Sequence, residues 1–173
     1  MNRSSPAKKI ALCAILSALI VAILAVGSII DVLDLSLALF AGIVVMIADL
    51  EFSEGYGWSV FAVSALLSLL LPVKTPSLLY ALFFGWYPLL RKRLSVLKTW
   101  IRIPLKILLF NALTAAALFS SIYLFGAEQE PVWLTLLTIL LANLLFALYE
   151  PALSRFASFY LFRLRDKLGL HKK

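Results

Sequence analysis

The sequence predicts an all-α membrane protein, a bundle of six transmembrane helices with the N-terminus and the C-terminus in the cytoplasm. Of its 173 residues 63% are apolar and 14% are charged, whereas a soluble domain carries roughly a quarter charged residues. The apolar residues form long blocks with few polar interruptions. The basic residues fall almost entirely on one side when the loops are read alternately. We therefore expect a multi-pass protein of the bacterial inner (cytoplasmic) membrane.

Six apolar blocks approach the length of about 20 residues that a membrane span needs. Together they leave short loops and two tails, with no room for a separate soluble domain, so residues 1–173 are expected to form a single membrane domain. The predicted spans cover residues 10–30, 32–50, 56–73, 77–90, 104–125 and 132–153.

The first block is expected to remain in the protein, because its apolar stretch of about 20 residues exceeds the 7–15 of a signal-peptide core. The fourth block, 77–90, would be about 21 Å long as a helix, against a hydrocarbon core of about 30 Å. Blocks three and four could instead form a hairpin that enters and returns. Two full spans are favoured, because the hairpin would place Lys74 in lipid.

Charge fixes the expected orientation. Fifteen of the 16 Lys and Arg residues lie in the predicted inner segments, and Lys74 is the exception. The net charge of +7 is thus a topology signal. The cations flank spans and form no separate basic domain, so the sequence gives no indication of nucleic-acid binding.

Two inner segments have the pattern of helices lying on a membrane surface. In residues 91–102, "RKRLSVLKTWIR", apolar residues recur at helical spacing among cations. Residues 154–168 place aromatic residues before a group of arginines. Either segment could anchor to anionic lipid, and the first could instead dock a cytoplasmic partner.

The motifs of catalysis are missing from the sequence. There is no G-x-x-x-x-G-K-[ST] phosphate loop, so ATP hydrolysis by that route is excluded. His171 is the single histidine and Cys13 the single cysteine, which leaves no Ser-His-Asp triad, metal cluster or disulfide. We expect neither an enzyme nor a bound cofactor or metal.

A few polar residues interrupt the last two predicted spans. Asn111 and Asn143 lie near mid-membrane, and Lys106 and Glu150 lie nearer the inner end. Polar groups in lipid are costly and usually face protein or a cavity. One interpretation is an interhelical hydrogen bond and an ion pair, or a Lys106 that extends to the headgroups. The other is a substrate pocket in the outer half of the membrane, lined by Tyr80, Tyr123, Trp133, Asn143 and Asn111.

The first span carries a stripe of small residues. At about 100° per residue its alanines fall within an arc of roughly 80°, and they are Ala7, Ala11, Ala14, Ala18, Ala22 and Ala25. Such a stripe lets another helix approach closely. The pattern leaves open whether that helix belongs to the same chain or to a partner.

The stripe in "ALCAILSALIVA", just after a Lys-Lys pair, and the six-span topology resemble the substrate-binding S component of bacterial energy-coupling factor (ECF) transporters. The resemblance implies capture of a vitamin or similar micronutrient, with Ala14, Ala18 and Ala22 docking a transmembrane coupling protein. It also implies two cytoplasmic ATPases as further partners. A non-transporting scaffold of a cell-shape or envelope complex, or a small self-sufficient transporter, would share the size and charge bias.

Overall fold

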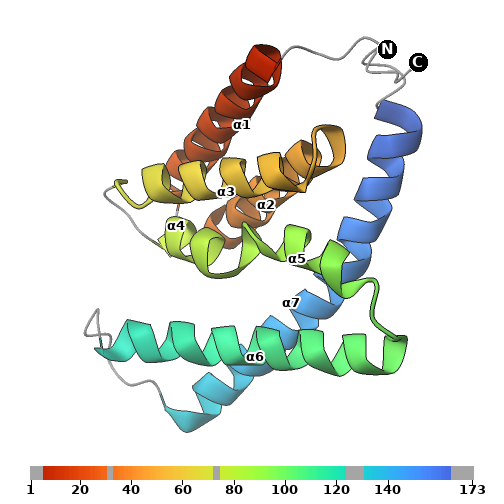
Figure 1. Ribbon diagram of the computed structural model, residues 1–173. Helices are drawn as coiled ribbons and strands as arrows, with labels where there is room; N and C mark the ends of the chain where they lie inside the picture. Colours follow the sequence, from red (N-terminus) through yellow and green to blue (C-terminus); the bar gives the residue numbers. More distant parts are fainter. Residues whose placement is uncertain (1–5, 31–32, 72–74, 124–130, 165–173) are drawn as a thin grey trace. The chain divides into compact units, whose positions relative to one another are not determined.

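The computed structural model describes residues 6–30, 33–71, 75–123 and 131–164, and the regular elements within these ranges are all helical (Figure 1). This confirms the all-α class for the described residues. The chain divides into two compact units. Unit 1 comprises residues up to Arg93 together with Phe156 onward, and unit 2 comprises Leu94–Arg155.

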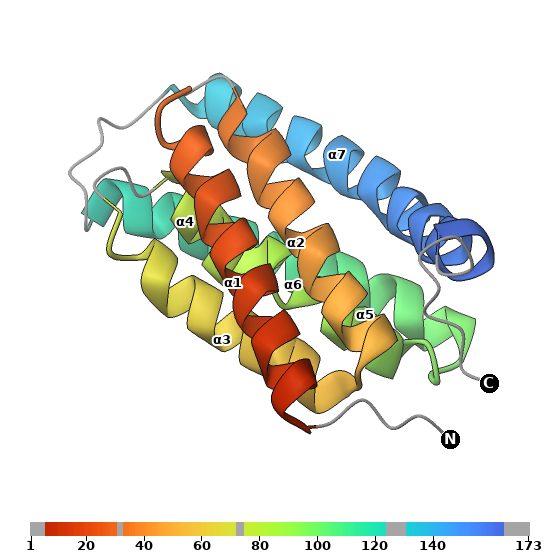
Figure 2. The ribbon, with the colours of Figure 1, turned by 90° about the horizontal axis from the view of Figure 1, so that it is seen from above.

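Unit 1 is built on three helices, α1 (Pro6–Gly27), α2 (Asp34–Glu51) and α3 (Glu54–Ser68), each of which packs against the other two. Figure 2 shows α1 and α2 side by side. The first helix buries one face, made of Cys13, Ser17, Ile20, Leu24 and Gly27. These residues follow one another at intervals of three or four, as expected for one side of a helix.

The second helix presents small residues to the same core. Ala38, Ala41, Gly42, Val45 and Ala48 are buried. Small side chains let helix backbones approach closely. The interior of unit 1 is therefore close-packed around the small face of α2.

The fourth predicted span is divided into three short pieces. These are α4 (Thr75–Leu79), the π-helical turn η2 (Tyr80–Phe84) and α5 (Tyr87–Leu94). The break follows η2 at Gly85, where an added Cβ would lie 2.6 Å from the Phe61 ring and 2.9 Å from Tyr80. Glycine is required there because any side chain would collide with these rings.

The last part of unit 1 comes from the far end of the chain. The π-helical turn η3 (Tyr160–Leu164) follows α7, and the Tyr160 hydroxyl donates a hydrogen bond of 3.1 Å to Glu51 Oε1 at the end of α2. Tyr160 is buried. The segment predicted to lie on the membrane surface is thus, in its described part, helical and joined to α2.

Unit 2 holds α6 (Thr99–Tyr123) and most of α7 (Val132–Phe159). Both helices run further than the apolar blocks that predicted them. The helix α6 begins at Thr99, before the predicted start at 104, and α7 continues to Phe159, past the predicted end at 153. The backbone hydrogen bonds of a helix continue into polar sequence, whereas hydropathy marks only the part that suits lipid. The apolar blocks therefore miss the start of α6 and the end of α7.

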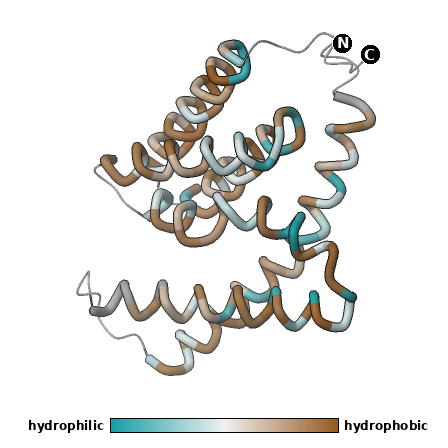
Figure 3. The backbone as a smooth tube through the Cα atoms, in the orientation of Figure 1, coloured by the Kyte–Doolittle hydropathy of each residue, from teal (hydrophilic) through white to brown (hydrophobic). Residues whose placement is uncertain are grey.

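Two helices in the described part of the chain are long and apolar enough to cross a membrane, Pro6–Gly27 and Val132–Phe162. Figure 3 shows hydrophobic residues along much of both and hydrophilic residues around the end of α5. Other predicted spans have shorter or more charged helices, since α3 has 15 residues and α2 contains Asp34, Asp49 and Glu51.

Candidate functional site

The alanine stripe of α1 lies outside the core of unit 1. Ala7, Ala11, Ala14, Ala18 and Ala22 are exposed, and Ala25 is half-buried. At about 100° per residue the stripe is centred roughly 140° from the buried face that contains Ile20 and Leu24. The helix therefore packs against α2 and α3 with one face and presents its smallest side chains on another.

The buried face of α1 is fixed by close contacts near its end. Ile20 and Leu24 have no exposed surface. A Cβ added to Gly27 would lie 3.3 Å from Cβ of Pro76, at the start of α4. Because these contacts set the rotation of α1, the alanine face is not available to the core of unit 1.

The predicted pocket residue Tyr80 is fully buried in unit 1. Its hydroxyl and that of Ser64 are 2.7 Å apart and share a hydrogen bond, and Ser64 also donates to the carbonyl of Val60. The Tyr80 ring lies 5.8 Å from the Phe61 ring, centroid to centroid. The hydroxyl thus joins η2 to α3 inside the unit.

Asn111 and Asn143 form a reciprocal pair between α6 and α7. Asn111 Nδ2 donates to Asn143 Oδ1 at 3.0 Å, and Asn143 Nδ2 donates to Asn111 Oδ1 at 2.9 Å. Each amide also donates to a backbone carbonyl one turn earlier in its own helix, at Ile107 and Ile139. The interhelical hydrogen bond that the sequence offered as one interpretation is confirmed.

The same two helices are joined by an ion pair and an aromatic stack. Lys106 Nζ donates to Glu150 Oε1, and the Lys106 side chain is 9% exposed. One turn further along α6, the Phe110 ring stacks on Phe146 with centroids 4.6 Å apart. The ion-pair interpretation of Lys106 is therefore also confirmed. Residues later in α6 contact residues earlier in α7, so the two helices are antiparallel.

The predicted pocket residues are divided between the two units or lie outside the described residues. Trp133, at the start of α7, is 65% exposed. The side chain of Tyr123 lies outside the described residues. Tyr80 belongs to unit 1, whereas Trp133, Asn111 and Asn143 belong to unit 2. A shared substrate pocket stays a prediction.

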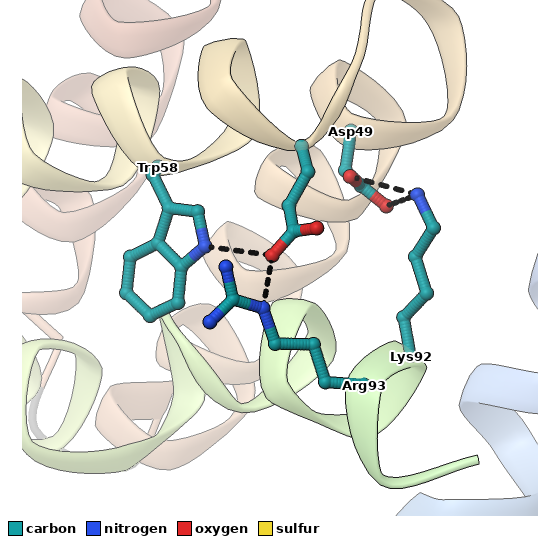
Figure 4. Close-up of polar contacts among 5 residues, drawn as sticks. Asp49, Trp58, Lys92 and Arg93 are labelled. Atoms are coloured by element: carbon teal, nitrogen blue, oxygen red, sulfur yellow. Dashed lines mark hydrogen bonds and ion pairs between the residues drawn. The ribbon is translucent and has the colours of Figure 1, made fainter. Parts of the chain in front are cut away.

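Three acids that the sequence pattern did not mark as site residues lie at the end of α2 and the start of α3, and each accepts a hydrogen bond from another segment. Asp49 accepts hydrogen bonds at 3.1 and 3.0 Å from Lys92 Nζ, and its side chain is 3% exposed. Glu54 accepts from Arg93 Nε and, at 3.4 Å, from Trp58 Nε1. Figure 4 shows both cations reaching from α5 to these acids.

The contacts of Lys92 with Asp49 and of Arg93 with Glu54 hold part of the basic run at 91–93 close to α2 and α3. Glu51 accepts from Tyr160, so each of the three acids has a partner in another segment. The hydrogen bond from Arg93 lowers the pKa of Glu54 below its ordinary value, although partial burial opposes this. The sequence signal that could have predicted these pairs is that the three acids and the cation-rich loop 91–102 are expected on the same, inner side of the membrane.

No group of three or more His, Cys, Asp or Glu side chains that could hold a metal ion occurs among the described residues. No known protein family model, curated protein or solved structure matches this chain.

Proposed function

We propose that this protein is the membrane-embedded, substrate-binding subunit of an ECF-type importer for a vitamin or similar micronutrient. In this proposal it is a six-span protein of the cytoplasmic membrane with both ends inside. Separate partners, a transmembrane coupling protein and two cytoplasmic ATPases, supply the energy. The sequence has no phosphate loop of its own, which is compatible with that division of labour.

The observation that carries the proposal is the exposed alanine face of α1. Lipid is as apolar as a leucine side chain and gives a smooth helix face no advantage over a bulky one. Ala14, Ala18 and Ala22 lie away from the core that α1 shares with α2 and α3. A separate helix that must approach closely would give these small residues a purpose.

The membrane setting is supported by the apolar surface of α7. Leucines at every fourth position are exposed: Leu136 by 62%, Leu140 by 66%, Leu144 by 58% and Leu148 by 64%. They form one stripe along the helix. Contiguous apolar surface of this kind is uncommon on a protein dissolved in water, and lipid chains would cover it at no cost.

The experiment compares one substitution on the exposed face with one in the core. Ala18→Leu adds bulk to the alanine face, and Ala41→Leu adds the same bulk at a fully buried position of α2. We expect Ala18→Leu to keep the melting temperature of the purified protein and to lose co-purification with the coupling protein. Ala41→Leu should lower the stability by about 1–3 kcal/mol through over-packing.

The outcome that contradicts the proposal is equally direct. If Ala18→Leu melts as early as Ala41→Leu, the alanine face packs within the chain, and the strongest residue-level support for an importer subunit is lost. If it melts normally and every interaction and substrate uptake persist, the face has no docking role.

A non-transporting membrane scaffold is the second candidate, and the Asn111–Asn143 pair favours it. Both N–H donors of each amide are already used within the protein, by the partner amide and by a backbone carbonyl. These amides then serve helix association and leave no donor for a substrate. Native mass spectrometry separates the two functions. An importer subunit should retain a co-purified small molecule, and Trp133→Ala should weaken the binding of that molecule. A scaffold should retain none.

A further inference from the structure

The entry to α6 exposes an unusual amount of apolar side chain. Trp100 is 92% exposed and Val96 is 88% exposed. We call residues 96–103 the α6 entry surface. Its other apolar residues are also exposed: Leu97 at 40%, Ile101 at 55% and Ile103 at 52%. An indole ring held almost entirely outside the protein indicates a surface that something else covers.

Two cations accompany these apolar residues. Lys98 and Arg102 lie one helical turn apart, since the Arg102 backbone N–H donates to the Lys98 carbonyl at 3.0 Å. Neither cation is paired with a carboxylate among the described residues. Lys92, Arg93 and Lys106, by contrast, each have an acidic partner. The positive charge of the entry surface is therefore uncompensated within the described protein.

Lys98 immediately precedes α6 and Arg102 lies in its first turn, so the charge of the helix end adds to theirs. The first turn of α6 contains no acidic residue. The N-terminal end of a helix is itself partially positive, so cations there are unfavourable and an anion is favourable. Lys98 and Arg102 add positive charge where the helix already has it, and an external anion would relieve the repulsion.

We propose that the α6 entry surface binds anionic phospholipid at the membrane interface. Lys98 and Arg102 contact the headgroup phosphates, and Trp100 enters the boundary between headgroups and acyl chains, where indole rings are enriched. A free phosphate ion would satisfy the cations and leave the apolar side chains uncovered. Each Lys or Arg near an anionic leaflet strengthens the attraction. This role needs neither a substrate nor a coupling protein, so it stands apart from the proposed import function.

The test places the full-length protein in phosphatidylcholine vesicles that contain brominated lipid, which quenches nearby tryptophan fluorescence. The protein has four tryptophans, and the difference in emission between the wild type and Trp100→Phe isolates Trp100. We expect brominated phosphatidylglycerol to quench Trp100 at a lower mole fraction than brominated phosphatidylcholine does.

The charge variants decide the role of the cations. Lys98→Gln/Arg102→Gln should reduce the preference for phosphatidylglycerol by about 30-fold, while the matched control Lys98→Arg/Arg102→Lys should retain it. Equal quenching by the two lipids in the wild type, or an unchanged preference in the glutamine variant, would overturn the proposal. Absence of quenching by either lipid would also overturn it and would assign the surface to a protein partner.

Discussion

Asn111 on α6 and Asn143 on α7 donate a hydrogen bond to each other, at 3.0 and 2.9 Å. The second N–H of each amide donates to a backbone carbonyl of its own helix, at 2.9 Å in both cases. The pair therefore satisfies all four of its donors without water, which suits an apolar environment where an unmatched polar group is costly. Its geometry supports a primary role in fixing the register of the two helices.

The first prediction is a measurable coupling between these amides. Asn111→Ala, Asn143→Ala and the double variant form a thermodynamic cycle. We expect a coupling free energy of about 1 kcal/mol, somewhat above the average of about 0.6 kcal/mol for interhelical hydrogen bonds in membranes, because two bonds are lost together. Reversible unfolding in mixed micelles provides the measurement, and strictly additive single substitutions would contradict the reciprocal pairing.

The second prediction concerns two glycines of α3 that differ in their surroundings. A Cβ added to Gly57 would lie 2.8 Å from Leu89 Cδ2 and 3.0 Å from Asp49 Cβ, whereas nothing lies within 4 Å of one added to Gly55. Gly57→Ala should lower the stability by about 1–3 kcal/mol through over-packing.

The matched control is Gly55→Ala. It should be neutral or stabilising by up to about 1 kcal/mol, because alanine is the better helix former. Melting temperatures of the two variants, measured side by side, test the contrast. Equal melting temperatures would mean that α3 does not approach Asp49 and Leu89 as closely as the structure shows.

The third prediction is a pH dependence at Glu54. The hydrogen bond from Arg93 lowers the pKa of Glu54 in the folded protein below the ordinary value of 4.5. The ionised side chain therefore contributes stability that is fully present above the ordinary pKa and is lost as the pH falls through the lowered pKa. The wild type should melt above Glu54→Gln at neutral pH, and the difference should disappear in acid.

Salt provides the control for this pair, since the Arg93 side chain is 63% exposed and the Glu54 side chain 35%. High salt at neutral pH should narrow the difference in melting temperature, because exposed charges are screened. A difference that is independent of both pH and salt would show that Glu54 acts by packing and not by its charge.

The fourth prediction addresses the six-span topology. In a Cys13→Ala background, which removes the single native cysteine, a cysteine at Glu128 should react with a membrane-impermeant maleimide in intact cells. A cysteine at Ser95 should react after the cells are opened, because the positive-inside rule places 91–102 in the cytoplasm. Labelling of Ser95→Cys in intact cells would refute the scheme.

The sequence by itself determined the helical class and the kinds of contact that its polar residues could make. Long apolar blocks favour helices whether or not their neighbours are known. Asn111, Asn143, Lys106 and Glu150 stood out because polar groups are rare and costly in such blocks. The pairings Asn111–Asn143 and Lys106–Glu150 followed from placing these residues on two successive helices, and the structure contains both.

Tertiary structure alone decided which small face packs inside the protein. Both α1 and α2 carry small residues at helical spacing, yet Ala38, Ala41 and Ala48 of α2 are fully buried while Ala14 and Ala18 of α1 are exposed. Periodicity determines which residues share a face, but the direction of that face depends on the rotation of the helix against its neighbours. Contacts such as Gly27 with Pro76 set that rotation, and they join residues too far apart in the chain for any local pattern to specify.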